Sequence, residues 1–354
     1  MLTTDLSSFT RKPDLLEGSR WLLVIKSLDQ QDRRRRMIEA VRGGTLQRLT
    51  PRPISDGLVV TGRLEAASFQ IEHTLSLNEP RHVCPLPTGD FLISDISGIS
   101  LITEKLQIKR RYTNPLFAFL HTITLSEDGR RILVCSTGLD SIVELSLDSG
   151  EQTFRWCAWE HGFNPDADGT WLTLDEAVHK KNMAEGRRSE FIEIPRPEHG
   201  IITSHRSAHP NAAIYENRLG IASILISIGY SGEVYRIAMD DGAPELVGKF
   251  APLSHGLHRI SEGWRITETT KGRWLSLDKA FSPKRSYVSS KLGEKVEGAE
   301  KSEWLQAVIP AGSTSFLLLD ANRGLIATDL ATETLTFYRP DPNWCVQDAY
   351  FLST

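Results

Sequence analysis

The chain has 354 residues, a formal net charge of −4 and an isoelectric point near 6.2. Apolar residues make up 40% of it and charged residues 24%, as in an ordinary soluble globular protein. This balance gives no whole-molecule attraction for nucleic acid or for an anionic membrane, so neither is expected as a partner. The N-terminal residues lack the basic and apolar regions of a secretory signal, and no run of about 18 apolar residues occurs.

The four cysteines are scattered along the chain and form no CxxC pair. They are Cys84, Cys135, Cys157 and Cys345. Four cysteines in a chain of this length do not make a disulfide framework, so we expect reduced, mostly buried thiols. With no signal and no membrane segment, the sequence predicts a cytoplasmic protein.

The first predicted elements are a strand that begins at Arg20, in RWLLVIKS, and a helix over about residues 29–42. The RRRR run of Arg33–Arg36 lies on that helix among acidic and polar neighbours, so it is expected to be surface charge.

From residue 81 onward, one pattern recurs: a His or Gln lead, a short apolar stretch, a turn with glycine, and a β-rich run. The leads are His82, His121, His209, His258, Gln306 and Gln347. Successive leads lie 39, 88, 49, 48 and 41 residues apart. Periods of about 40 to 50 residues, with short strands closed by Gly, Asp or Ser turns, are typical of four-stranded propeller blades.

The sequence therefore predicts an all-β fold, a single β-propeller domain over residues 1–354 with six four-stranded blades, five or seven being the alternatives. Only seven residues follow Gln347, so N-terminal strands are expected to complete that blade and close the ring. The 88-residue gap carries a helix-like segment and no clear blade. We interpret it as a long helical insertion over about residues 161–204, with an irregular extra blade as the alternative.

In a propeller, the lead residue of each repeat faces the central channel. Imidazoles that converge from several strands suit a mononuclear metal, so His82, His121, His209 and His258 are predicted metal ligands. Iron is the favoured divalent metal, with copper, manganese and zinc as alternatives, and some propeller oxygenases offer an architectural analogy with four histidines around iron. Gln306 and Gln347 would hydrogen-bond a ligated imidazole or a bound substrate.

Several residues beside the leads are candidates for catalysis. His209 and His258 could act as bases or nucleophiles, and Asn211 could orient a bound group. Arg259, together with Arg81 and Arg206, could hold an anionic group through its guanidinium fork. The alternatives are a metal-free histidine site and a channel whose polar side chains are structural or only bind a ligand.

Several segments resemble the arylsulfotransferase-like group of propellers: RHVCPLPTGDFLISD, LDSIVELSLDSGEQTFRWCAWEHGF, HPNAAIY and ISIGYSGEVYRI. The resemblance spans roughly residues 80 to 270. It implies a six-bladed propeller in which a channel histidine accepts a sulfuryl group, helped by a second histidine, an asparagine and an arginine. His209 and Asn211 match the HPN motif, and His82 and His258 match more loosely.

Three functions follow as hypotheses. The first is a metal-dependent oxidoreductase or lyase that acts on a small organic molecule. The second is metal-free, sulfotransferase-like group transfer through a channel histidine. The third is a non-catalytic scaffold that binds a protein partner through the 161–204 insertion, a segment that would be a lid or rim in the two enzyme hypotheses.

Overall fold

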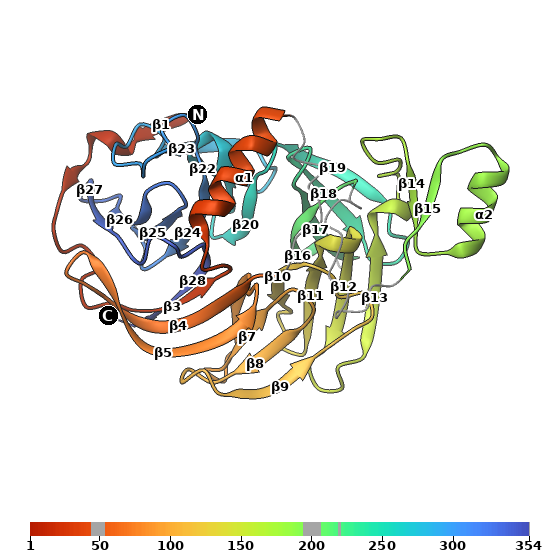
Figure 1. The fold of residues 1–354 in the computed structure, drawn as a ribbon, viewed down its shortest axis with the longest axis horizontal. Coiled ribbons are helices and arrows are strands. Elements are labelled where there is room, and N and C mark those ends of the chain that lie inside the picture. The colour runs from red at the N-terminus through yellow and green to blue at the C-terminus, as the bar shows by residue number, and fades with distance from the viewer. Residues whose placement is uncertain (44–53, 194–206, 219–220, 354) are drawn as a thin grey trace.

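In the computed structural model, six four-stranded antiparallel units are arranged in a ring (Figure 1). The structure describes residues 1–43, 54–193, 207–218 and 221–353. The predicted all-β propeller with six blades is therefore confirmed. Among the described residues, no helix is both long and apolar enough to cross a bilayer.

Blades 2 to 4 follow one another along the chain, with the first strand of each innermost. Blade 2 contains β6 (His82–Pro85), β7 (Phe91–Ser94), β8 (Ile99–Ile102) and β9 (Ile108–Tyr112). Blade 3 contains β10 (Leu120–Leu125), β11 (Arg131–Ser136), β12 (Ser141–Ser146) and β13 (Gln152–Cys157). Blade 4 contains β16 (Pro210–Arg218), β17 (Ile221–Ile228), β18 (Glu233–Ala238) and β19 (Pro244–Lys249).

Blades 5 and 6 each gain a fifth strand from the N-terminus, which the sequence did not predict. Blade 5 contains β20 (His255–Ile260), β21 (Gly263–Glu268), β22 (Arg273–Asp278) and β23 (Pro283–Val288), and β1 (Leu2–Asp5) pairs in parallel with β23. Blade 6 contains β24 (Leu305–Pro310), β25 (Ser315–Asp320), β26 (Gly324–Asp329) and β27 (Thr334–Tyr338), and β2 (Thr10–Arg11) pairs in parallel with β27.

Blade 1 closes the ring with strands from both ends of the chain, as predicted. It contains β28 (Val346–Ser353), β3 (Arg20–Ile25), β4 (Asp56–Glu65) and β5 (Ser68–Asn78). The C-terminal β28 is innermost and pairs antiparallel with β3. This pairing removes the open edges that an unclosed ring would expose.

Six apolar clusters hold the ring together, one at each junction between neighbouring blades. Strand β3 shows why the sequence produces this arrangement. Trp21, Leu23 and Ile25 pack toward blade 6, whereas Leu22 and Val24 pack toward blade 2. Successive side chains of a strand point to opposite faces, so a strand covered on both faces is apolar throughout.

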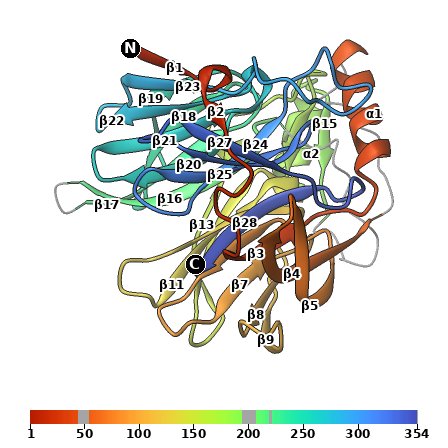
Figure 2. The same ribbon diagram turned by 90° about the vertical axis from the view of Figure 1, so that its left-hand side faces the viewer.

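Two helices lie outside the blades. α1 (Gln30–Gly43) connects β3 to β4, close to the predicted range of 29–42, and rests on one face of the ring (Figure 2). β14 (Trp171–Thr173), α2 (Glu176–Ala184) and β15 (Ser189–Phe191) form a small unit between blades 3 and 4 that projects beyond the ring (Figure 1). This unit occupies much of the predicted insertion, of which residues 194–204 lie outside the described residues, as does Arg206.

The innermost strands share an irregularity that positions the channel residues. In β10, β16, β20, β24 and β28 the pairing register with the next strand shifts within the first few residues. Such a bulge adds a residue on one strand and re-aims the side chains around it. The leads His121, Gln306 and Gln347 lie inside these bulges, as does Asn211.

Candidate functional site

Three imidazoles meet where the innermost strands of blades 3, 4 and 5 begin, at the mouth of the channel. The ring centroid of His121 lies 5.5 Å from that of His209 and 6.0 Å from that of His255. Burial lowers the pKa of His121 well below its usual value, and the nearby charge of Arg81 and the two other imidazoles lower it further. The site therefore holds neutral imidazole at neutral pH, the form that can act as a base or nucleophile.

His209 is held in place through its backbone. Its φ of +59° is in the left-handed region, which is unfavourable for a residue other than glycine. The buried carboxylate of Asp140 accepts hydrogen bonds from the backbone N–H groups of His209 at 2.7 Å and Ala208 at 3.0 Å. It also accepts from the indole N–H of Trp159 at 2.9 Å. These bonds hold the segment before β16 in the conformation that delivers the His209 ring to the mouth.

Glycine is required behind His209. A Cβ at Gly229 would lie 2.6 Å from Cδ2 of the imidazole, closer than such contacts occur. On another side the ring of Tyr230 stacks on His209, with centroids 5.0 Å apart. The imidazole is therefore confined by Gly229 and Tyr230.

The tautomer of His255 follows from its contacts. Its Nδ1 lies 2.8 Å from the carbonyl oxygen of Leu253, which can only accept, so Nδ1 carries the proton. Nε2 then keeps its lone pair, and burial lowers the pKa of this imidazole to about 4. Trp304 lies on a further side, 6.5 Å between ring centroids, and its indole N–H donates to Oε1 of Gln306 at 3.0 Å.

Two cations flank the mouth. The guanidinium carbon of Arg81 lies 3.6 Å from the ring centroid of Phe119, and Nζ of Lys26 lies 5.4 Å from the same centroid. Arg81 forms a buried ion pair with Glu79 at 2.8 Å. The positive charge of Lys26 contributes to the lowered pKa of both His121 and His255, so its field reaches the imidazoles.

The two other predicted ligands, His82 and His258, form a deeper group. The backbone N–H of Ile123 donates to Nδ1 of His82 at 3.3 Å, so the proton of His82 is on Nε2, 3.6 Å from Oδ2 of Asp348. Burial lowers the pKa of His258 to about 3, with contributions from the charges of Arg265 and His82. In blade 5 the residue at the mouth is therefore His255, and His258 lies three residues further along β20.

Two of the remaining predicted residues lie close to the mouth imidazoles. Gln306 contacts Trp304, and the amide of Asn211 lies beside Gly229, behind His209. Asn211 is buried and donates from Nδ2 to the carbonyl oxygen of Ser254 at 2.6 Å. Arg259 is half exposed and pairs with Glu127 on the surface at 3.3 Å. Gln347 is buried in β28.

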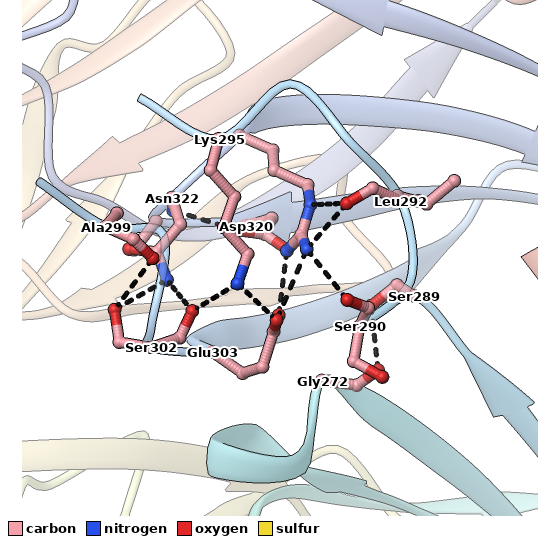
Figure 3. Close-up of polar contacts among 12 residues, drawn as sticks. Gly272, Ser289, Ser290, Leu292, Lys295, Ala299, Ser302, Glu303, Asp320 and Asn322 are labelled. Atoms are coloured by element: carbon pink, nitrogen blue, oxygen red, sulfur yellow. Dashed lines mark hydrogen bonds and ion pairs between the residues drawn. The ribbon is translucent and has the colours of Figure 1, made fainter. Parts of the chain in front are cut away.

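The connection from β23 to β24, which carries Trp304, is fixed by a buried charge network (Figure 3). The fully buried guanidinium of Arg323 pairs with Asp320 and Glu303, each at 2.8 Å, and donates to the carbonyl oxygen of Leu292 at 3.0 Å. Lys295 donates to the carbonyl oxygen of Ser302 at 2.8 Å. This network positions one wall of the mouth.

Helix α1 lies at the same end of the channel as the mouth. Lys26, just before it, donates its backbone N–H to the carbonyl oxygen of Cys345, next to β28. Arg34 donates to the carbonyl oxygen of Ala321 at 2.7 Å. Ala321 directly follows β25, whose last residue pairs with the first residue of β24. The helix thus rests on the face into which the mouth opens.

A cavity of about 310 Å³ shares Tyr230 with the histidine cluster. Its aromatic wall includes His161, Phe163 and Tyr235, with Phe163 and Tyr235 nearly perpendicular at 5.2 Å between centroids. The carboxylate of Glu233 also lines it and accepts from the hydroxyl of Tyr235 at 3.0 Å. A flat or ring-bearing molecule fits such a wall.

In the described part of the chain, no group of three or more His, Cys, Asp or Glu side chains has an arrangement that could hold a metal ion. The predicted ligands are divided between the mouth and the deeper group. The four ligands predicted for iron therefore do not come together in one such group among the described residues.

Sequence reasoning missed Lys26 and Asp140, and it did not recognise Arg265. Lys26 follows a strand with no motif around it, and Asp140 acts on residues almost 70 positions away. His255, three residues before His258, was identified from the sequence as a candidate for the same end of the channel, and it begins its strand as His82 begins β6.

No protein-family model and no curated protein matches the chain. Similar solved structures include a protein of unknown function from Bacteroides caccae, at 13% identity and TM-score 0.49, covering 91% of this chain and 100% of that one. A chain of a nidogen/laminin complex is 13% identical at TM-score 0.48, covering 90% of this chain and 98% of that one. The propeller assignment rests on the order of strands in the sheets.

Proposed function

We propose that this protein binds a small anionic molecule at the channel mouth and transfers its anionic group through a mouth histidine. The observation that carries the proposal is the contact of the neutral His121 with two further imidazoles, within the field of Lys26. A cation beside neutral imidazoles favours an anion over a divalent metal. The sulfotransferase resemblance points to the same chemistry.

His209 is the favoured nucleophile. A neutral ring nitrogen attacks the sulfur or phosphorus of the bound ester, a new N–S or N–P bond forms, and the bond to the leaving oxygen breaks. The attacking imidazole, now bonded to the transferred group, gives up the proton on its other ring nitrogen, and a neighbouring imidazole relays that proton to the leaving oxygen. An acceptor hydroxyl then attacks the transferred group, its proton returns to the ring nitrogen, and the bond to nitrogen breaks. Lys26 and Arg81 stabilise the oxygens of the transferred group.

The aromatic cavity supports a ring-bearing donor or acceptor. Tyr230 belongs to its wall and stacks on His209, so a ring held there lies next to the nucleophile. The cavity volume of about 310 Å³ is at the lower end of ordinary small-molecule sites.

The experiment uses untagged protein with 4-nitrophenyl sulfate and 4-nitrophenyl phosphate as donors and phenol as acceptor. We expect release of 4-nitrophenol, and a trapped histidine adduct by mass spectrometry of the protein mixed with donor alone. His209→Asn should abolish both signals, and His121→Asn should slow transfer by about 100-fold or more. His73→Asn, on the exposed edge strand β5, is the matched control and should behave as wild type.

Two results would overturn the proposal. One is the absence of both release and adduct with every donor tried. The other is stoichiometric bound metal in wild type and His73→Asn that is lost in His121→Asn, which would favour the metal enzyme expected from the sequence.

A further inference from the structure

Three arginines are buried in the described part of the chain, and two of them have carboxylate partners. Arg81 pairs with Glu79, and Arg323 pairs with Glu303 and Asp320. Arg323 also donates to the carbonyl oxygens of Ser290 and Leu292. Arg265 is the third, with 8% of its surface exposed, and it forms no ion pair or hydrogen bond with a described side chain or backbone group.

Arg265 lies in β21, directly opposite His258 of the innermost strand β20. Its guanidinium carbon is 5.8 Å from the ring centroid of Phe316 in blade 6. His258 feels the charges of both Arg265 and His82, so the three side chains form one group around the deeper part of the channel. The side chain of His82 is 18% exposed although it lies inside the ring, so solvent reaches this depth.

No acidic group in the described part of the chain compensates the charge of Arg265. Burial lowers its pKa to about 10, and no acidic group contributes to the shift. The guanidinium therefore stays charged at neutral pH in a place where water only partly solvates it. Asp348, the acid of the deeper group, is engaged instead with His82 and with the backbone N–H of Val83 at 3.0 Å. A buried charge without a partner is unfavourable, and a bound anion would relieve this cost.

We propose that Arg265 and His258 form a second anion site in the channel, for the carboxylate, sulfate or phosphate group of a small molecule. The planar guanidinium presents paired donors to two oxygens of such a group. The His258 imidazole offers a third donor from the cross-strand position. None of the mouth residues takes part, so this site stands whether or not group transfer occurs at the mouth.

The test measures thermal unfolding of the full chain in sodium phosphate, sulfate or acetate, at an ionic strength held constant with chloride. In wild type, at least one anion should raise Tm with a saturating dependence, by about 5 °C near 100 times its Kd. Comparison of the rise in Tm in phosphate and sulfate with that in acetate shows whether the site prefers a tetrahedral anion or a carboxylate. Lys26→Met removes the cation at the mouth. It should keep the part of the rise in Tm that is due to anion binding at Arg265.

Arg265→Met should abolish that part, and without added anion its Tm should equal or exceed that of wild type, because the uncompensated charge is gone. Arg323→Met, which leaves two carboxylates unpaired, should instead lower Tm markedly. The proposal fails if Arg265→Met keeps the full anion-dependent rise, or if its Tm without anion falls as far as that of Arg323→Met. Histidine NMR gives a second readout. The resonance of His258 is identified by its absence in His258→Gln, and the anion should shift this resonance in wild type.

Discussion

Asp140 shows how a single buried side chain determines the position of another that is distant in sequence. Its carboxylate accepts from backbone groups on both sides of Ala208 and from Trp159. A carboxylate can satisfy several donors at once because it only accepts. The left-handed backbone of His209 is therefore stabilised by a residue in the turn before β12.

Asp140→Asn should lower the free energy of unfolding by roughly 2 to 3 kcal/mol, because the amide NH₂ group faces N–H donors and loses charge-assisted bonds. Urea denaturation measures this loss. Asp148→Asn, at an exposed turn, is the control and should change stability by less than about 0.5 kcal/mol. An Asp140→Asn protein as stable as the control would contradict this role.

The buried histidines predict a pH dependence of stability. Burial lowers the pKa of His255 to about 4 and that of His121 well below 6.5. Below about pH 6.5 the unfolded chain binds protons that the native chain does not, so the free energy of unfolding falls as pH falls. This stabilising contribution is complete above pH 6.5 and is lost progressively toward pH 4 for His255.

Denaturation between pH 7 and pH 5 measures the effect. The raised pKa of Asp140 and of Asp348 acts in the opposite direction. Each of His121 and His255 should contribute a loss on the order of 2 kcal/mol. His255→Gln should flatten the dependence by that amount, and His73→Gln should leave it unchanged. A flat stability profile in wild type would show that these imidazoles titrate normally.

At the scale of the elements, the connection from β23 to β24 depends on charge rather than on regular structure. Arg323 donates to carbonyl oxygens of residues 290, 292 and 293, and Glu303 pairs with both Arg323 and Lys295 (Figure 3). The segment has no strand or helix of its own, so these bonds replace a hydrogen-bond ladder.

Glu303→Gln should destabilise the protein by about 3 kcal/mol, because the buried Arg323 and the half-buried Lys295 both lose part of their compensation. Hydrogen exchange of the backbone amides should increase chiefly within residues 289–304, which include Trp304. Glu262→Gln, in the exposed turn between β20 and β21, is the control and should leave exchange unchanged. Equal exchange in both variants would mean that the segment is held by its apolar contacts alone.

The innermost strands were predictable from the sequence, whereas the exact residues at the mouth were not. The regular spacing of the leads predicted the innermost strands, because each blade repeats one supersecondary unit. The sequence predicted His258 as the lead residue of its blade, whereas the structure places His255 at the mouth, because the register of β20 shifts between the two residues. Gly256, with a φ of +62°, opens a bulge between them, and a bulge of one residue re-aims every side chain nearby. Charged partners such as Lys26 come from outside the repeat, so no period could indicate them.

At the scale of the whole molecule, ring closure by both chain ends was predictable from the short segment after Gln347. The added strands β1 and β2 were not, because two to four residues carry no periodic signal. Their partners are outer strands of other blades, an arrangement that only the folded ring defines.

Removal of residues 346–354 should abolish the cooperative fold, because β3 loses its inner partner and two apolar clusters open to water. Circular dichroism and size-exclusion chromatography would follow the loss, and a synthetic peptide of residues 345–353 should restore structure in part. Removal of residues 1–4 uncovers only the outer edge of blade 5 and should leave a folded ring. A truncated ring that melts like wild type would refute the importance of this closure.

The pairing of the N-terminal strands has a consequence for the order of events during synthesis. β1, β2 and β3 leave the ribosome before the other strands of the ring, yet they pair with β23, β27 and β28, which are synthesised more than 250 residues later. At about 5 to 20 residues per second, the apolar run of β3 waits on the order of tens of seconds for its partner. Blades 2, 3 and 4 can form in the meantime, each from its own consecutive strands. The first 25 residues are thus the part of the nascent chain with the longest need for protection from aggregation.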